Sequence, residues 1–410
     1  MNKKQLQRAI ENTPTGLDRI YDHNWTKITK LGEEKRDRAF ALLRWAAFAL
    51  RPLAVCEITE AVALLLSKGA DFAMTNKNGW TPLNSASING HAEVVKMLLE
   101  KGADFTTPDD DGWTPLNAAS SGGHAEVVKM LLEKGADFTT TDNDGWTPLN
   151  TASSNGHAEV VKMLLEKGAD ITTANNDGVT PLNAASNGGR AEVVKMLLEK
   201  GANAMTANNN GWTPLLSASA EGHVDVVKFL FESSPLHTTE TDSLGCTALF
   251  LASRNGRLPV VQYLLSTGRF DPDIKNYYGS TALSAAVANG HYEVVEILIS
   301  TGVSTQAQFH VGRSLVWWAS YAGKTEIIKL LSCHVESSES VPQNEPILAD
   351  IAFNATSRWC DACTRSISSK SLYYSCQKCV NLDLCVDCYE RGFRCRDQAH
   401  ALTAELGGES

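Results

Sequence analysis

A unit of 33 residues, repeated with few changes, is the sequence feature that most constrains the fold of this chain. The letters GWTPL begin at Gly79 and return at Gly112 and Gly145, GVTPL follows at Gly178, and GWTPL returns at Gly211. One such unit buries little apolar surface by itself, so units of this kind are stable only when each packs on its neighbours. The repeat therefore predicts an elongated array rather than a single globular core.

A fixed period of 33 residues with Thr-Pro-Leu near its start resembles the ankyrin repeat. The resemblance implies an all-α solenoid of helix-turn-helix repeats joined by hairpin loops. We expect a leading half repeat and eight full repeats, which together occupy residues 57–332. The full repeats are expected to start at Gly79, Gly112, Gly145, Gly178, Gly211, Gly245, Gly279 and Gly312.

Each repeat is expected to contain two helices separated by tight turns. In the first full repeat, Thr81 is a candidate N-cap, and Pro82 occupies the first helical position, where its missing N–H costs nothing. The second helix is expected from about Ala92 to Lys101. It should end at Gly102, because glycine adopts a positive φ without steric cost.

The segments that flank the repeats have a different composition. Residues 1–56 contain a helical apolar pattern that would cap the array, and GLDRIYDHNWTKI at residues 16–28 resembles the end of a NACHT (STAND) module, as fused to ankyrin repeats in fungal signalling proteins. The chain lacks the phosphate loop G-x-x-x-x-G-K-S/T that such a module needs. The segment is therefore either part of a truncated relative of a signalling ATPase or simply a pair of capping helices.

The end of the array also departs from the repeat. The last repeat, from Gly312, loses Thr-Pro-Leu and gains Trp317 and Trp318, which favours a capping role over a ligand site. Residues 333–357 are polar, acidic and rich in serine, and we interpret them as a linker. Residues 402–410 are expected to form a tail.

Cysteine is concentrated near the C-terminus, where seven of the ten cysteines lie within residues 360–395. Three C-x-x-C pairs are followed by one more cysteine and a histidine. In a chain without a recognisable secretion signal, such pairs favour zinc ligands over disulfides. Eight ligands suffice for two structural Zn²⁺ sites with no position open for a catalytic water. The candidate ligands are Cys360, Cys363, Cys376, Cys379, Cys385, Cys388, Cys395 and His400.

Residues 358–401 resemble a ZZ-type zinc finger. The resemblance implies a crossed arrangement of the ligands on two zinc ions, with Cys395 at a position where the family usually has histidine. One ion would be held by Cys360, Cys363, Cys385 and Cys388, and the other by Cys376, Cys379, Cys395 and His400.

Some ZZ domains bind the amino terminus of a partner in an acidic pocket. Asp361 and Asp383 match the family's acidic positions, whereas Asn381 and Leu382 replace a second acid and a tyrosine. Losing one carboxylate weakens a pocket for an ammonium group. The two aspartates are therefore either contacts for a peptide amino terminus, or solvated acids and partners of the zinc ligands.

Tryptophan recurs at the position before Thr-Pro-Leu, with Val179 as an interruption. In arrays that resemble ankyrin repeats this position lies on the hairpin and concave side. Aromatic side chains in register would suit recognition of an extended protein partner, although each indole could equally well pack on the adjacent hairpin. The candidate partner-binding residues here are Trp80, Trp113, Trp146 and Trp212.

A histidine recurs at the start of the second helix of most repeats. A catalytic or metal-binding role is the weaker interpretation, because the side chains are one repeat apart and Arg190 takes the position once. We expect them to form hydrogen bonds within their own repeats. The histidines are His91, His124, His157, His223 and His291.

Charge and hydropathy limit the classes of partner. The formal net charge is −10, with the acidic excess in the repeats, which argues against a nucleic-acid partner. No apolar run approaches the roughly 18 residues of a membrane span, and the N-terminus lacks the apolar region of a secretion signal. We therefore expect an intracellular protein, cytoplasmic or nuclear.

These observations favour a non-enzymatic adaptor whose repeats bind a protein on their concave face and whose zinc finger binds a second protein. A ubiquitin ligase, which the combination of ankyrin repeats and a ZZ finger also suggests, would need RING fingers with eight further ligands each. Three cysteines remain outside the C-terminal cluster, which is too few. The identity of the partner does not follow from the sequence.

Overall fold

The computed structural model of the chain describes most of the predicted array. The described residues are 59, 62–63, 66, 71–233, 240–305, 314–321, 323–334, 358–359, 366–367, 372–376, 383–385 and 402–406. The predicted N-terminal segment, residues 1–56, and nearly all of the predicted linker lie outside these residues.

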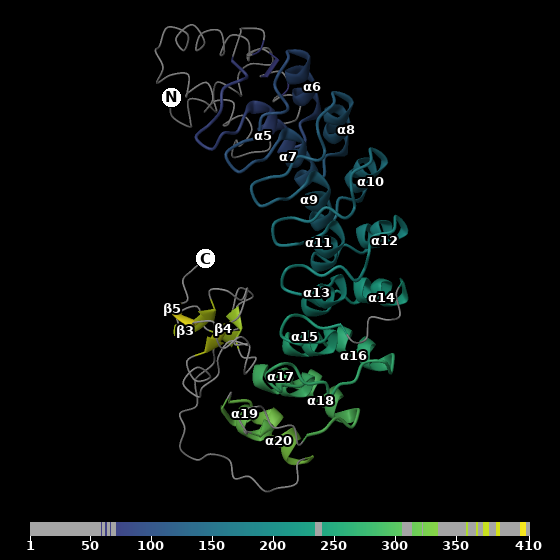
Figure 1. Cartoon of the computed structure of the whole chain (residues 1–410), viewed down its shortest axis with the longest axis vertical. Coiled ribbons are helices and arrows are strands. Elements are labelled where there is room, and N and C mark those ends of the chain that lie inside the picture. Colours follow the sequence, from purple (N-terminus) through teal and green to yellow (C-terminus); the bar gives the residue numbers. More distant parts are fainter. Residues whose placement is uncertain are drawn as a thin grey trace, which may run out of the picture. The chain divides into compact units, whose positions relative to one another are not determined.

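The chain divides into two compact units. The first comprises Met1–Ala152 and His157–Asp170, and the second comprises Ser153–Gly156 and Ile171–Ser410. In each unit short helices follow one another in pairs, one pair to a repeat (Figure 1). The predicted helical solenoid is thus confirmed within both units.

The first helix of each pair, here the inner helix, packs on the inner helices of neighbouring repeats in its unit. The second, here the outer helix, packs in the same way on outer helices. The helices that begin in the first unit are α5 (Pro82–Ile88), α6 (Ala92–Glu100), α7 (Pro115–Gly122), α8 (Ala125–Glu133), α9 (Pro148–Asn155) and α10 (Ala158–Glu166). Those of the second unit are α11 (Pro181–Asn187), α12 (Ala191–Glu199), α13 (Pro214–Glu221), α14 (Val224–Ser233), α15 (Ala248–Arg254), α16 (Leu258–Ser266), α17 (Ala282–Asn289), α18 (Tyr292–Ser300), α19 (Leu315–Tyr321) and α20 (Thr325–Ser332).

Local sequence sets where these helices begin and end. The Oγ1 of Thr81 accepts a hydrogen bond from the N–H of Asn84, and Pro82 follows at the first helical position. Helix α6 ends at Glu100, and Gly102 follows it with φ +83°. The predicted N-cap and glycine stop are therefore confirmed, and the same pattern recurs in the neighbouring repeats.

The core runs through the repeats between the inner and outer helices. In the first full repeat Val95, Leu98 and Leu99 of α6 are buried, as predicted, together with Leu83 of α5. In the last repeat Trp317 and Trp318 of α19 are also buried, with their rings edge to face at 5.0 Å. Their burial agrees with a capping role, because end repeats close the core.

The residue before most outer helices forms a hydrogen bond to the preceding repeat, which corrects the expectation of hydrogen bonds within one repeat. The Nε2 of His124 lies 2.9 Å from the carbonyl oxygen of Ile88, one repeat earlier. Because a carbonyl only accepts, Nε2 carries the hydrogen. Gly90 permits this approach, since a Cβ there would collide with the ring of His124.

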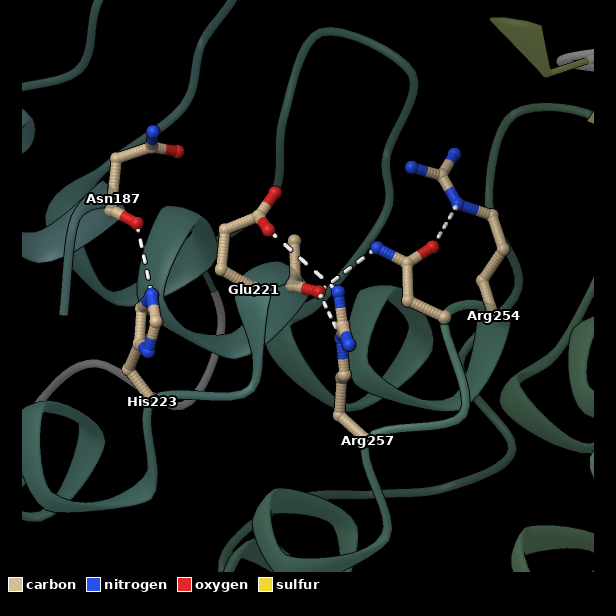
Figure 2. A network of polar contacts seen from close by, with 7 residues as sticks. Asn187, Glu221, His223, Arg254 and Arg257 are labelled. Atoms are coloured by element: carbon tan, nitrogen blue, oxygen red, sulfur yellow. Dashed lines mark hydrogen bonds and ion pairs between the residues drawn. The ribbon is translucent and has the colours of Figure 1, made fainter. Parts of the chain in front are cut away.

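Figure 2 shows the same arrangement in the second unit, where arginine serves as well as histidine. His223 bonds to the carbonyl oxygen of Asn187 at 2.9 Å, and the Nε of Arg257 donates to that of Ala220 at 3.0 Å. Arg257 also forms an ion pair with Glu221 at 3.6 Å. In both cases the acceptor is a carbonyl group at the C-terminal end of the inner helix of the preceding repeat. That helix has no N–H group of its own to offer this carbonyl.

A second column of residues, on the inner helices, carries buried hydroxyl groups. These serines have no solvent exposure, and their Oγ atoms have no hydrogen-bond partner among the residues that the structure describes. A buried hydroxyl without a partner lowers the free energy of unfolding. The serines are Ser87, Ser120, Ser153, Ser186, Ser219 and Ser253.

The C-terminal region contains strands, so the chain is not wholly helical. A two-stranded antiparallel sheet joins β1 (Arg358–Trp359) to β2 (Ser366–Ile367). A three-stranded antiparallel sheet has the order β4-β3-β5. Its strands are β3 (Leu372–Cys376), β4 (Asp383–Cys385) and β5 (Leu402–Leu406).

Strand β5 corrects the prediction of a tail over residues 402–410. Leu402 to Leu406 pair with β3, with Cys376 opposite Leu402 and Leu372 opposite Leu406. The sequence LTAEL alternates apolar and polar residues, the period of a strand with one buried face. That alternation was present in the sequence and was overlooked.

No helix among the described residues is long and apolar enough to span a lipid bilayer.

We predict that Ser219→Ala raises the free energy of unfolding by about 1 kcal/mol, because it removes a buried hydroxyl that has no partner. Urea unfolding of the full-length chain measures the change. Ser266→Ala serves as the control, since Ser266 is exposed and its Oγ donates to the carbonyl oxygen of Tyr263. A loss of stability in Ser219→Ala would show that its hydroxyl is in fact bonded.

The structure also predicts how stability depends on pH. Burial lowers the pKa of His291 below 6.5, and the nearby Arg257 and Lys324 lower it further, against opposing effects of the Arg254 carbonyl and Glu293. Below pH 6.5 the unfolded chain therefore takes up a proton that the folded chain resists, so stability falls as the pH is lowered.

The midpoint of urea unfolding, measured between pH 7.5 and pH 5, tests this expectation. His291→Gln retains a donor and should flatten the dependence on pH, whereas His334→Gln, at an exposed histidine after α20, should leave it unchanged. Equal slopes in the wild type and His291→Gln would contradict the prediction.

Candidate functional site

The repeats whose loops the structure describes each begin with a hairpin loop that is closed by hydrogen bonds to one side chain. In the second full repeat the Oδ1 of Asp109 accepts hydrogen bonds from the N–H groups of Asp111 at 3.0 Å and Trp113 at 2.7 Å. The N–H of Asp109 donates to the carbonyl oxygen of Trp113 at 3.0 Å. Aspartate or asparagine makes the same bonds in other repeats, at Asn76, Asp142, Asn175, Asn208, Asp242 and Asn276.

Neighbouring hairpin loops of the first unit are also bonded to one another. The N–H of Asp110 donates to the carbonyl oxygen of Asn78 at 3.2 Å. One repeat later, the N–H of Asn143 donates to the carbonyl oxygen of Asp111 at 3.0 Å, and its Nδ2 donates to that of Asp110 at 2.9 Å. The loops are thus held in register from one repeat to the next.

Asparagine side chains of the inner helices form hydrogen bonds to the tryptophan backbone of the following repeat. The Nδ2 of Asn84 in α5 donates to the carbonyl oxygen of Trp113 at 3.0 Å, and Asn117 in α7 does the same to Trp146 at 3.4 Å. Both backbone polar groups of Trp113 are therefore bonded. The backbone of Trp113 is thus held by hydrogen bonds from side chains of two repeats, Asn84 and Asp109.

The predicted tryptophans occupy equivalent places in these loops. Trp80, Trp113 and Trp146 belong to consecutive repeats of the first unit, and all three side chains are half-buried. Trp212, in the second unit, is half-buried in a loop of the same construction. Each of these residues is partly covered by the protein and partly accessible, so both interpretations of this position are compatible with the structure. Contact with a partner stays a prediction.

We call the exposed parts of loops 76–80, 109–113 and 142–146 in the first unit the hairpin surface. It is acidic on balance, because Asp110, Asp111 and Asp144 are exposed there together with one lysine, Lys77. Burial raises the pKa of Asp109, the hydrogen bonds from the N–H groups of Trp113 and Asp111 oppose that rise, and the neighbouring charges of Asp111 and Asp110 add to it.

The aspartates that precede the hairpin loops behave differently. Hydrogen bonds from Thr106 and Thr107 lower the pKa of Asp104 to about 2. A bond from Thr139 likewise lowers the pKa of Asp137. Hydrogen bonds within their loops outweigh burial for these two carboxylates, whereas for Asp109 burial outweighs them.

The sequence analysis missed the aspartates and asparagines that close the loops. Their signal was available, because aspartate or asparagine stands four residues before the tryptophan position in successive repeats. It also missed Tyr277, which lies next to the closing residue of its loop and is 47% exposed. A lone aromatic residue gives no periodic signal, so the sequence offered little reason to select it.

The predicted zinc ligands lie mostly outside the described residues. Cys376 ends β3 and Cys385 ends β4, and Cys385 stands opposite Tyr373, three residues before Cys376. Asp383 stands opposite Ser375 on the same pair of strands. Within the described part of the chain no group of three or more histidine, cysteine, aspartate or glutamate residues could hold a metal ion. The other predicted ligands and Asp361 fall outside that part.

A comparison with protein families identifies the repeats. A family model described as ankyrin repeats (3 copies) matches residues 46–109, 106–175, 173–242 and 234–309, which together make up more than half of the chain. No curated protein matches the chain. The matched residues end at 309, so the resemblances to a ZZ finger and to a NACHT module remain predictions.

Proposed function

Because the chain belongs to the ankyrin repeat family, whose members are generally protein-binding scaffolds without catalytic activity, we propose that it is an adaptor that holds a protein partner on its hairpin surface. The observation that carries the proposal is the series of partly exposed indoles of Trp80, Trp113 and Trp146. They recur at one position in consecutive repeats of a single unit.

The energetics of binding favour this surface. Tryptophan is enriched among the residues that contribute most to protein interfaces, because a rigid indole buries a large area with few rotatable bonds. Trp113 and Trp146 stand on backbones that are already hydrogen-bonded to the preceding repeat. Such pre-organisation reduces the conformational entropy that is lost when a partner binds.

We propose further that residues 358–401 form a ZZ-type finger that holds two structural zinc ions and contacts a second protein. The proposal is supported by the cysteine spacing and by the small antiparallel sheet on which Cys376 and Cys385 lie. The register offsets these two cysteines by three residues, roughly 10 Å along a strand, which agrees with their assignment to different ions. Asp361 and Asp383 are the proposed contacts for an amino terminus in an intracellular partner.

We predict that Trp113→Ala/Trp146→Ala abolishes capture of the cellular partner by the full-length chain. Truncation of two central anchors typically costs several kcal/mol of binding free energy. The measurement is affinity purification with quantitative mass spectrometry, followed by rebinding of the purified partner. The matched control is Lys129→Ala/Lys162→Ala, which alters exposed side chains of the outer helices α8 and α10. Identical partners for all variants would refute the hairpin surface as a binding site.

The zinc finger has its own prediction. The purified, reduced chain should contain about two zinc ions by elemental analysis, and Cys376→Ser should lower that number, because a closed tetrahedral site needs all of its ligands. Cys333→Ser is the control, since this exposed cysteine follows α20 and lies outside the cluster. A chain that is folded and free of zinc would contradict the proposal.

A further inference from the structure

Asp109 carries a negative charge that its hairpin loop does not require. Its Oδ1 makes the two backbone bonds that close the loop. In the first full repeat the neutral Asn76 makes the same two bonds, to Asn78 and Trp80. Because asparagine closes the loop equally well, the charge of Asp109 has no part in the local fold.

The second carboxylate oxygen of Asp109, Oδ2, is buried without a hydrogen bond to any described residue. The residue is 7% exposed, and its Oδ2 has no hydrogen-bond partner among the residues that the structure describes. The charges nearest to it in the chain are those of Asp110 and Asp111, which are of the same sign. A buried charge without a partner reduces stability, so its presence needs another explanation.

Asp242 occupies the same loop position but has a cation among the groups that act on its charge. It is also 7% exposed and closes its loop through Oδ1. Burial raises the pKa of Asp242, and the backbone hydrogen bonds from Cys246 and Leu244, together with the charge of Arg254 at the end of α15, oppose that rise. The guanidinium group of Arg254 is drawn in Figure 2. The causes that set the pKa of Asp109 include no such cation.

The surroundings of Asp109 are suited to a cation from outside. Exposed carboxylates lie beside it at Asp110 and Asp111 and in the next loop at Asp144. The ion pairs found in the described part of the chain do not include any of these acids. Partly exposed indoles follow in the same loops at Trp113 and Trp146, and the face of an indole attracts guanidinium and ammonium groups.

On the basis of the proposed function, we propose that the hairpin surface binds an extended polypeptide segment with arginine or lysine at every third residue. One basic side chain would lie over Asp109 and Trp113, and the next over Asp144 and Trp146. Charge complementarity selects this occupant, because nucleic acid carries the wrong sign.

The spacing follows from the packing of the repeats. Inner helices α5 and α7 are in contact, and packed helices lie about 8–10 Å apart. A polyproline II segment, which is extended and has three residues per turn, rises about 3.1 Å per residue, so three residues of the partner correspond to one repeat. Side chains at every third position then point to the same side and can contact the same position in consecutive loops.

The test uses the full-length chain and a fluorescein-labelled peptide of twelve residues. In the probe, arginine occupies every third position and glycine or serine the others. A second peptide of the same composition has its four arginines in succession. Fluorescence anisotropy in low salt should show tighter binding of the spaced peptide.

The decisive variant is Asp109→Asn, because asparagine preserves both backbone bonds of the loop. It should weaken binding of the spaced peptide by about fivefold or more, while the urea midpoint of the chain stays the same or rises. Glu133→Gln, which removes one exposed charge at the end of α8, is the control and should bind as the wild type does.

Three outcomes would overturn the inference. The first is unchanged affinity in Asp109→Asn, and the second is equal affinity for the spaced and clustered peptides, which would show attraction by net charge alone. The third is tight binding of Ca²⁺ that Asp109→Asn abolishes, which would make the loop a metal site. If the partner is lost in Trp113→Ala/Trp146→Ala but the spaced peptide does not bind, the proposed function stands and this inference fails.

Discussion

The contact between neighbouring repeats is the interaction on which the rest of the structure depends. Each inner helix ends in carbonyl groups that its own helix cannot satisfy, and a donor from the following repeat reaches one of them, as His124 does for Ile88. Buried side chains such as Val95 and Leu98 extend this contact through the core. A repeat removed from its neighbours would lose both the hydrogen bond and the buried apolar contacts. The free energy of unfolding of each unit therefore comes mainly from the interfaces between its repeats.

The sequence predicted those features that depend on local chemistry. The N-cap Thr81 and the glycine stop at Gly102 act within a few residues of their own helix, so their period was enough to place them. The destination of the histidine hydrogen bonds was predicted wrongly. His124 bonds to a residue 36 positions earlier, slightly more than one repeat, and such a distance follows only from the way in which two repeats pack.

The sequence predicted the tryptophans of the candidate site but not the role of Asp109. The tryptophans formed a periodic pattern, whereas the importance of Asp109 emerges only when the two oxygens of its carboxylate are considered separately. One oxygen closes the loop, as the amide oxygen of Asn76 does, and the other is buried without a partner. A sequence treats aspartate and asparagine at this position as similar turn residues. The three-dimensional structure shows that they differ in a buried charge.

This division of roles explains how nearly identical repeats can carry different surfaces. The loop geometry depends on a single acceptor oxygen that aspartate and asparagine share, so exchange between them changes charge without changing the backbone. Where the charge has an internal partner, as Asp242 has Arg254, that partner offsets part of the cost of burying the charge. Where it has none, as at Asp109, it lowers stability. Natural proteins retain such unfavourable features mainly at functional sites. The buried carboxylate oxygen of Asp109, without a partner among the described residues, is therefore the physical argument for placing the proposed partner at the second repeat.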